Sequence, residues 1–215
     1  MKLYKAFFLI IIFNFLFSNT NLDLPNDVRW VVNSGEYNKL CKQIYSQATE
    51  DLSKIFIDGQ SAIIMDLDET VLDNSQYQIE INEKGESFSM SSWAKWVLRA
   101  EAKLVPGAKD FFDYIRKMNI QIIFISNRMN ERLSSTVKNM KKINIYNEND
   151  IYLLRLNKAD KKDIRRNEVY TGTGRMKTVG SKKIVAYFGD AMGDFSLTDN
   201  SGKEYIFPNP MYGKW

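Results

Sequence analysis

The chain lacks histidine and has a single cysteine among its 215 residues. Without histidine it cannot form a Ser-His-Asp triad, a Cys-His dyad, a phosphohistidine or a histidine-ligated zinc site. The one cysteine, Cys41, excludes a disulfide framework or a cage of thiolate ligands within one chain. Residues 42–47 contain no arginine that could cradle a phosphate beside it, so we expect Cys41 to be a small core residue on a helix. Any catalysis must therefore use carboxylates, lysine, hydroxyl groups or a metal ion.

The apolar run at residues 6–17 is shorter than the roughly 20 residues that span a bilayer. It follows Lys2 and Lys5 and precedes small polar residues, an order typical of a secretory signal peptide. We therefore predict a signal peptide over 1–20, a single domain over 21–215, and export to the periplasm, the cell surface or the medium. Because no Ala-x-Ala cleavage site is present, an uncleaved segment that associates with a membrane stays open as the alternative.

Charge of neither sign is in large excess. The chain has 30 lysine and arginine residues against 26 aspartate and glutamate residues, which gives a formal net charge of +4. This balance is too mild to favour a nucleic-acid polymer as partner. Hydrophobic residues make up 44% and charged residues 26% of the chain, as is typical of a soluble globular domain.

Two apolar runs, each typical of a buried strand, end in closely spaced acids. Asp66 and Asp68 follow the first run, and Asp190 and Asp194 follow the second. Ligands bind at the carboxyl ends of the strands in open α/β sheets, so we expect these carboxylates to converge. Such a cluster needs protons or a hard cation such as Mg²⁺ to be stable. The alternative is that each aspartate only caps a helix or fills a turn.

Strand-like and helix-like patterns alternate along the chain, which indicates an α/β fold with a mostly parallel sheet. Apolar residues at three- and four-residue spacing predict a first helix whose buried face includes Leu40, Cys41 and Phe56. Residues 74–105 are polar and aromatic and are predicted to cap the end of the first strand. Further along we predict a helix over 108–118, strands over 120–125 and 151–154, a basic helix over 159–167 and a loop over 170–181.

Five short sequence blocks follow one another in a distinctive order. They are Asp-Leu-Asp-Glu-Thr-Val-Leu-Asp-Asn-Ser at 66–75, Trp-Ala-Lys-Trp at 93–96, Val-Pro-Gly-Ala at 105–108, Ile-Ser-Asn-Arg at 125–128 and Pro-Asn-Pro-Met-Tyr-Gly at 208–213. Together they resemble the class C bacterial acid phosphatases of the haloacid dehalogenase superfamily, which include secreted and lipoprotein 5′-nucleotidases. The resemblance implies a Rossmannoid parallel sheet flanked by helices, with a small helical cap insertion. Family lipoproteins carry a cysteine after the signal peptide, and this chain has none there, so we do not expect a lipid anchor.

The resemblance also implies a role for each acid, and the chemistry of phosphoryl transfer agrees with these roles. Asp66 would be the nucleophile that forms an aspartyl-phosphate. Asp68 would protonate the leaving oxygen and then activate water. Mg²⁺ would bind the carboxylates of Asp66 and Asp190 and the main-chain carbonyl of Asp68, with Asp194 as a further ligand through water or as a support.

The same resemblance implies which residues contact the phosphoryl group. Ser126 would donate its hydroxyl to a phosphoryl oxygen, with Asn127 nearby, although a serine at a strand end is often only a turn residue. Lys161 would stabilise the phosphoryl charge, with Lys158 as the alternative. The many basic residues around Lys161 are also consistent with a solvated helix face.

Two aromatic residues are candidates for binding the rest of the substrate. By resemblance, Trp93 and Tyr212 would stack on a nucleobase or an aromatic leaving group, although the spacing of Trp93 and Trp96 also fits a buried core. We therefore predict a secreted Mg²⁺-dependent acid phosphatase that hydrolyses small phosphomonoesters, in particular nucleoside 5′-monophosphates. The alternatives are a phosphotransferase that uses the same intermediate and a non-catalytic storage or binding protein. The presence of Asp66 argues against the latter, and oligomerisation is left open.

Overall fold

The computed structural model describes residues 24–195 and 202–213, so the predicted signal peptide lies outside the described residues. Its centre is a five-stranded parallel sheet, which confirms the predicted α/β fold. In the order in which they lie side by side, the strands are β5 (Ile151–Arg155), β4 (Gln121–Met129), β1 (Ser61–Met65), β6 (Lys183–Gly189) and β7 (Lys203–Ile206). A separate antiparallel pair joins β2 (Leu72–Asp73) to β3 (Lys103–Leu104).

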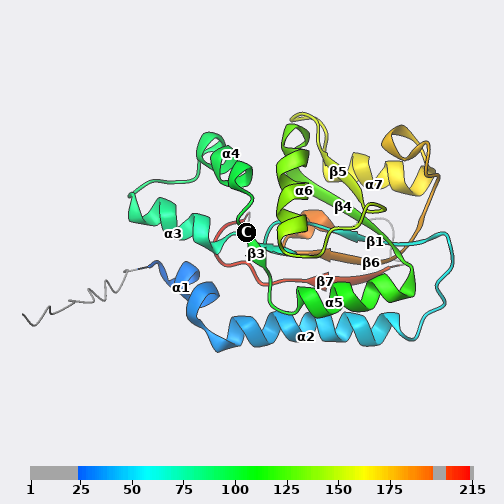
Figure 1. The fold of residues 1–215 in the computed structure, drawn as a ribbon, viewed down its shortest axis with the longest axis horizontal. Helices are drawn as coiled ribbons and strands as arrows, with labels where there is room; N and C mark the ends of the chain where they lie inside the picture. Colours follow the sequence, from blue (N-terminus) through cyan, green and yellow to red (C-terminus); the bar gives the residue numbers. More distant parts are fainter. Residues whose placement is uncertain (1–23, 196–201, 214–215) are drawn as a thin grey trace, which may run out of the picture.

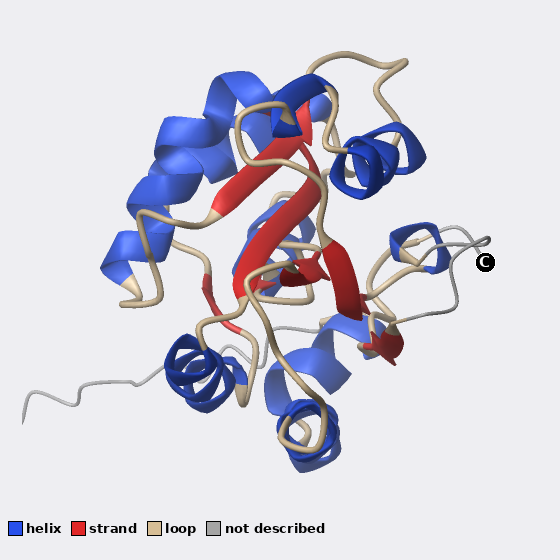
Figure 2. Cartoon of the chain, turned by 90° about the vertical axis from the view of Figure 1, so that its right-hand side faces the viewer, coloured by secondary structure: helices blue, strands red, loops and turns tan. Residues whose placement is uncertain are grey.

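Helices cover both faces of the sheet. Helices α2 (Gly35–Leu52) and α5 (Ala108–Ile115) lie along one face, and α7 (Lys162–Thr171) lies on the opposite side (Figure 1). Figure 2 shows helices on both sides of the strands. In the part of the chain that is described, none of the helices is long and apolar enough to cross a membrane. The helices are α1 (Asn26–Asn33), α2 (Gly35–Leu52), α3 (Ser75–Glu83), α4 (Met90–Arg99), α5 (Ala108–Ile115), α6 (Leu133–Lys142) and α7 (Lys162–Thr171).

The small helical cap predicted by resemblance is formed by α3 and α4. Both helices lie between β2 and β3 in the chain and within the predicted insertion at 74–105. They lie to the left of the sheet in Figure 1, where α3 contacts α1 and α4 contacts α6. Ser89 caps the start of α4, because its hydroxyl accepts a hydrogen bond from the amide of Ser92 at 3.0 Å.

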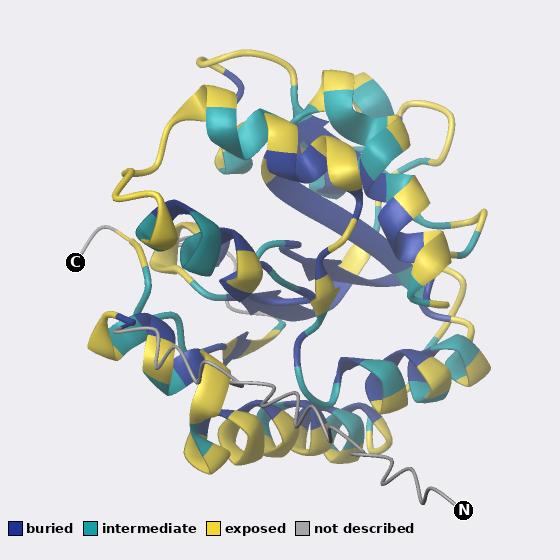
Figure 3. Ribbon diagram, turned by 60° about the vertical axis from the view of Figure 1, so that its left-hand side comes forward, coloured by how far each residue is buried: buried dark blue, intermediate teal, exposed yellow. Residues whose placement is uncertain are grey.

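The central strands are largely buried on both faces (Figure 3), because β1, β6 and residues 122–125 of β4 are mostly apolar. Alternate residues of each strand therefore serve two different cores. Ile63 of β1 belongs to the core shared with α2 and α5, which includes Phe111. Ile64 belongs to the core on the other face, which includes Val169 of α7.

The first predicted helix corresponds to α2 and ends earlier than predicted. Helix α2 ends at Leu52, so Phe56 lies beyond it and is 85% exposed. Leu40 is also wrongly predicted to be buried, because it is 40% exposed on the outer side of the helix. Cys41 is fully buried, which confirms the prediction that it is a core residue.

Two predicted boundaries near the carboxyl ends of the strands also differ from the structure. Strand β4 continues to Met129, where its pairing with β5 resumes after a register shift that begins at Ser126. Helix α7 begins at Lys162 rather than at residue 159, because the chain first makes a turn closed by Asp160. The Asp160 carboxylate accepts a hydrogen bond from the Leu156 amide at 2.9 Å.

One buried hydroxyl ties α2 to the segment that follows β1. The hydroxyl of Tyr45 donates to the Thr70 carbonyl at 2.7 Å, deep in the core. We expect Tyr45→Phe to leave this carbonyl unpaired and to cost about 1–3 kcal/mol of unfolding free energy. Thermal unfolding should show a Tm lower by about 2–10 °C. Tyr146→Phe, in which an exposed ring loses its hydroxyl, is the control and should leave the Tm unchanged. Equal Tm values for the two variants would contradict this role of Tyr45.

Candidate active site

The structure brings three predicted carboxylates together at the carboxyl ends of β1 and β6. Asp66 directly follows β1, and its amide donates to the Phe188 carbonyl at 2.9 Å, which holds it against β6. Asp190 directly follows β6, and Asp194 lies in the 3₁₀ turn at 192–194. One carboxylate oxygen from each of these residues lies within 4.8 Å of the others.

The backbone around Asp194 explains how this residue reaches the cluster. Its carboxylate turns back and accepts a hydrogen bond from the Ala191 amide at 3.0 Å. The returning side chain passes directly over Gly189, where an added Cβ would lie 2.2 Å from the Asp194 Cβ. Only glycine therefore fits at this position without moving Asp194.

A lysine bridges the carboxylates, but it is not the predicted one. Lys162 donates a hydrogen bond to Asp66 Oδ1 at 2.6 Å and another to Asp194 Oδ1. Lys161 and Lys158 are exposed, and no hydrogen bond or ion pair joins their side chains to the cluster. The placement of the lysine is therefore corrected by one residue. The reason is the later start of α7, which makes Lys162 the first helical residue and leaves Lys161 at the N-cap.

The charges of the cluster do not balance. Burial lowers the pKa of Lys162, but Asp66 and Asp194 more than offset this and raise the pKa above its ordinary value, so the ammonium stays charged. Burial raises the pKa of Asp66, and burial together with the neighbouring Asp194 raises the pKa of Asp190 to about 6. Three carboxylates thus share one ammonium in a largely buried place. A hard divalent cation fits this excess of carboxylate oxygens.

Asp190 is held by the C-terminal segment. Asn209 donates a hydrogen bond from its side-chain amide to Asp190 Oδ2 at 2.7 Å. The side-chain oxygen of Asn209 in turn accepts a hydrogen bond from the Met211 amide at 3.1 Å, which closes the turn that carries Tyr212. Tyr212 is 38% exposed, as is suitable for contact with a ligand. Its predicted role in substrate binding stays a prediction.

The side chain of Asp68 does not join the cluster. Its carboxylate accepts hydrogen bonds from Arg128, the shortest at 2.7 Å, and from the side-chain amide of Asn74 at 3.0 Å. Sequence reasoning missed both partners. Arg128 lies within the block at 125–128 and is almost completely buried, but a single arginine in a strand gives no signal of that burial.

Ser126 and Asn127 lie within β4, whereas the sequence predicts them just past the end of a strand over 120–125. Ser126 is buried and its hydroxyl accepts a hydrogen bond from the Arg128 amide at 3.2 Å, whereas Asn127 is exposed. The fully buried Arg165 of α7 supports both residues, because it donates to the Ser126 carbonyl and, at 3.0 Å, to Asn127 Oδ1. A solvated basic face, the alternative considered for this helix, is therefore wrong at Arg165 and also at the buried Arg166.

The cap carries an aromatic cluster formed by Tyr77, Phe88, Trp93 and Trp96. Trp93 is half-buried and meets Tyr77 edge to face at a centroid distance of 5.2 Å. Trp96 is buried, as its spacing allowed, and donates its indole N–H to Asn74 Oδ1 at 2.8 Å. Trp93 is thus the more accessible of the two tryptophans.

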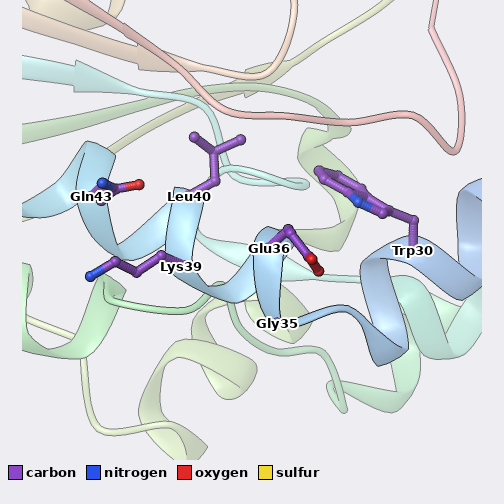
Figure 4. A pocket seen from close by; sticks show the side chains of 6 residues that line it. All are labelled: Trp30, Gly35, Glu36, Lys39, Leu40 and Gln43. Atoms are coloured by element: carbon purple, nitrogen blue, oxygen red, sulfur yellow. The ribbon is translucent and has the colours of Figure 1, made fainter.

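Two surface hollows within the described ranges lie away from the carboxylate cluster. Figure 4 shows one between α1 and the start of α2, with a volume of about 440 Å³. A second, of about 450 Å³, lies nearby between α1 and β3. Neither is lined by Lys162 or by a carboxylate of the cluster, so these hollows do not mark the candidate site.

Comparisons with known sequences point to one family. A family model described as HAD superfamily, subfamily IIIB (acid phosphatase), matches residues 12–215. The chain is 24% identical to the stem 31 kDa glycoprotein of Glycine max over 188 residues, which are 84% of this chain and 70% of that protein. It is 25% identical to acid phosphatase 1 of Solanum lycopersicum over 160 residues, which are 72% of this chain and 60% of that protein.

Two solved structures are similar to this fold. Both are of the class C acid phosphatase from Bacillus anthracis. The structure with tungstate bound has a TM-score of 0.71 and 32% sequence identity, and covers 87% of this chain and 84% of that chain. A second structure, with the same coverage, has a TM-score of 0.73 and 30% identity.

The unbalanced cluster generates a prediction about metal binding. Asp190→Asn removes one negative charge, so in EDTA we expect the variant to be more stable than the wild type by about 1 kcal/mol or more, a rise in Tm of about 2–4 °C. Millimolar Mg²⁺ should raise the Tm of the wild type but raise that of the variant much less. Thermal unfolding with each additive measures both effects.

The control for this experiment is Asp113→Asn, which neutralises an exposed carboxylate paired with Lys109. It should respond to EDTA and Mg²⁺ as the wild type does. If Mg²⁺ stabilised Asp190→Asn as strongly as the wild type, Asp190 would not be a ligand.

Proposed function

We propose that this chain, which belongs to the acid phosphatases of HAD superfamily subfamily IIIB, hydrolyses small phosphomonoesters through a phosphorylated Asp66 and with Mg²⁺. Membership of this family makes the chain a phosphomonoesterase. One observation carries the rest of the proposal. Asp66 lies at the end of β1, hydrogen-bonded to Lys162 and beside Asp190 and Asp194, so it is a buried nucleophile next to both a fixed cation and a cation site.

The first half-reaction transfers the phosphoryl group to Asp66. A carboxylate oxygen of Asp66 attacks phosphorus while the bond from phosphorus to the ester oxygen breaks. Asp68 gives its proton to that oxygen, so the alcohol leaves as a neutral molecule. Lys162 and the Ser126 hydroxyl donate hydrogen bonds to the phosphoryl oxygens and so stabilise their negative charge.

The second half-reaction releases phosphate. Water attacks phosphorus and gives a proton to the Asp68 carboxylate, while the bond between phosphorus and the Asp66 oxygen breaks. The products are inorganic phosphate and the original carboxylate of Asp66, and Asp68 is protonated again for the next cycle. Asp68 loses its proton in the first step and gains one in the second, so the same residue can act first as the acid and then as the base.

The residues present fit a divalent cation. The carboxylates of Asp66, Asp190 and Asp194 and the main-chain carbonyl of Asp68 would hold it, and their hard oxygen donors suit Mg²⁺. When bound, the cation neutralises charge on the phosphoryl oxygens. Lys162 remains in place to orient Asp66, and Asn209 orients Asp190.

The proposed substrates are nucleoside 5′-monophosphates and other small phosphomonoesters. The residues of the cluster contact only the phosphoryl group, so recognition of the alcohol has to come from other residues. Trp93 on the cap and Tyr212 on the C-terminal turn are accessible aromatic side chains, which supports a stacked nucleobase. Stacking of this kind contributes about 1–3 kcal/mol per base.

Export is proposed from the sequence before the described residues. Lys2 and Lys5 followed by the apolar run at 6–17 support a signal peptide, and a curated relative is named a glycoprotein. Residues 21–215 would then be the mature domain, with a membrane contact only if the segment stays uncleaved. An acceptor alcohol in place of water would make the same site a phosphotransferase, and measuring free phosphate against phosphorylated acceptor separates the two reactions.

The nucleophile is tested by Asp66→Asn. With Mg²⁺, we expect this variant to lose at least about a thousandfold in kcat against p-nitrophenyl phosphate and a panel of nucleoside monophosphates, because no aspartyl-phosphate can form. Mass spectrometry of acid-quenched wild type should find one phosphoryl group on the peptide that contains Asp66. Asp113→Asn is the control with full activity. Turnover by Asp66→Asn within tenfold of the wild type would contradict the mechanism.

Adjacent lysines provide a matched pair for the phosphate-binding cation. We expect Lys162→Ala to lower kcat/KM by about a hundredfold or more, because it removes the charge beside Asp66. Lys161→Ala removes the same charge one residue away, from an exposed position, and should stay within about twofold of the wild type. Steady-state kinetics on p-nitrophenyl phosphate decides between them. Equal losses would show that the corrected placement of the lysine is irrelevant to turnover.

A further inference from the structure

Arg128 is buried where the segment after β1, the cap and α6 meet. It lies near the end of β4, and only 1% of its side chain is exposed. Its guanidinium contacts Asp68 after β1, Asn74 at the start of α3, Trp93 on α4 and Thr136 on α6. A buried guanidinium is costly unless its donors are paired, so each contact constrains where the others can lie.

The contact with Asp68 engages both oxygens of the carboxylate. Arg128 Nε lies 3.0 Å from Asp68 Oδ1 and 3.1 Å from Oδ2, and a terminal nitrogen donates to Oδ1 at 2.7 Å. Asn74 adds a further hydrogen bond to Oδ1 at 3.0 Å. The orientation of the Asp68 side chain is therefore set by Arg128 and Asn74, not by the carboxylate cluster.

Arg128 also contacts the aromatic cluster of the cap and the asparagine that binds it. The guanidinium carbon lies 5.8 Å from the centroid of the Trp93 ring, in a cation–π arrangement. Arg128 also donates to Asn74 Oδ1 at 3.4 Å, the same oxygen that accepts from the Trp96 indole. One side chain thus connects the proposed acid to the proposed stacking residue.

We infer that Arg128 is a positioning residue that holds Asp68 against the leaving oxygen of the substrate and sets its place relative to Trp93. This inference rests on the proposed function, in which Asp68 supplies the proton to that oxygen. An alcohol bound beside Trp93 then presents its ester oxygen to an acid whose position is fixed. Substrates with poor leaving groups need this alignment most, because their alkoxides do not leave without a proton.

The leaving group provides a readout that a merely structural role would not move. Nitrophenolate leaves without a proton, whereas an alkoxide needs one. We expect Arg128→Lys to lower kcat/KM for an alkyl phosphate and for nucleoside monophosphates by about tenfold or more, and for p-nitrophenyl phosphate by less than about threefold. Arg128→Met should show the same selectivity with a larger loss, since lysine keeps the charge but not the forked hydrogen bonds.

Arg116 offers a matched control. It forms a forked pair with the buried Asp150, at 2.5 and 2.6 Å, and its guanidinium carbon lies 5.5 Å from the Phe112 ring centroid. Arg116→Met therefore breaks the same kind of contacts at a place remote from the carboxylates. It should lower the Tm without changing the ratio of kcat/KM values between the alkyl and nitrophenyl substrates.

A double-mutant cycle with Asp68→Asn tests whether Arg128 acts through Asp68. In the Asp68→Asn background, Arg128→Lys should cause no further selective loss on alkyl phosphates. Equal losses on all substrates, or an undiminished selective loss in the Asp68→Asn background, would overturn the inference. If Asp68→Asn alone left alkyl phosphate turnover intact, the proposed acid would be wrong, a failure distinct from that of Arg128. Should Arg128→Met not fold, Arg128→Lys carries the test.

Discussion

The repulsion among three closely spaced and largely buried carboxylates is the constraint on which this site depends. Asp66, Asp190 and Asp194 present oxygens within 4.8 Å of one another, and only Lys162 among the described residues bonds directly to two of them. Folding therefore leaves an excess of negative charge that a divalent cation is suited to balance. The local structure serves this arrangement, because the missing side chain at Gly189 gives Asp194 room to return to the cluster. The same charge that destabilises the metal-free protein supports the proposed chemistry, since a cation next to Asp66 can offset the charge of a phosphate.

The sequence predicted those features that depend on strand order, and it failed where the phase of a helix decides. Acids placed directly after β1 and β6 had to meet, because adjacent parallel strands end at the same edge of the sheet. The side chain that contacts Asp66 is Lys162 rather than Lys161, because a turn closed by Asp160 delays the start of α7. Phe56 lies beyond the end of the helix in which the sequence predicts it. A shift of one residue turns a helix by about 100°, so a small boundary error selects a different side chain.

The burial of two arginines could not be predicted from the sequence, for a different reason. Arg128 and Arg165 stand in segments that read as a strand end and as a basic helix, and nothing in their spacing distinguishes a buried guanidinium from a solvated one. Tertiary partners decide, namely the carboxylate of Asp68 for the first and the carbonyls of Ser126 and Leu153 for the second. Arg128 links β4 to the segment that follows β1, and Arg165 links α7 to β4 and β5. In the proposed mechanism, Asp68 and Ser126 are thus oriented by arginines that lie outside the carboxylate cluster.

The central claim is that phosphate leaves through two successive in-line displacements, the first by Asp66 and the second by water. The stereochemical course at phosphorus tests this claim most directly. A thiophosphate monoester made chiral with oxygen isotopes can be hydrolysed in isotopically labelled water with Mg²⁺, and the configuration of the released thiophosphate determined. Each displacement inverts phosphorus, so two displacements predict net retention of configuration. Net inversion would contradict the account, because it requires a single direct attack by water and leaves no place for a phosphorylated Asp66.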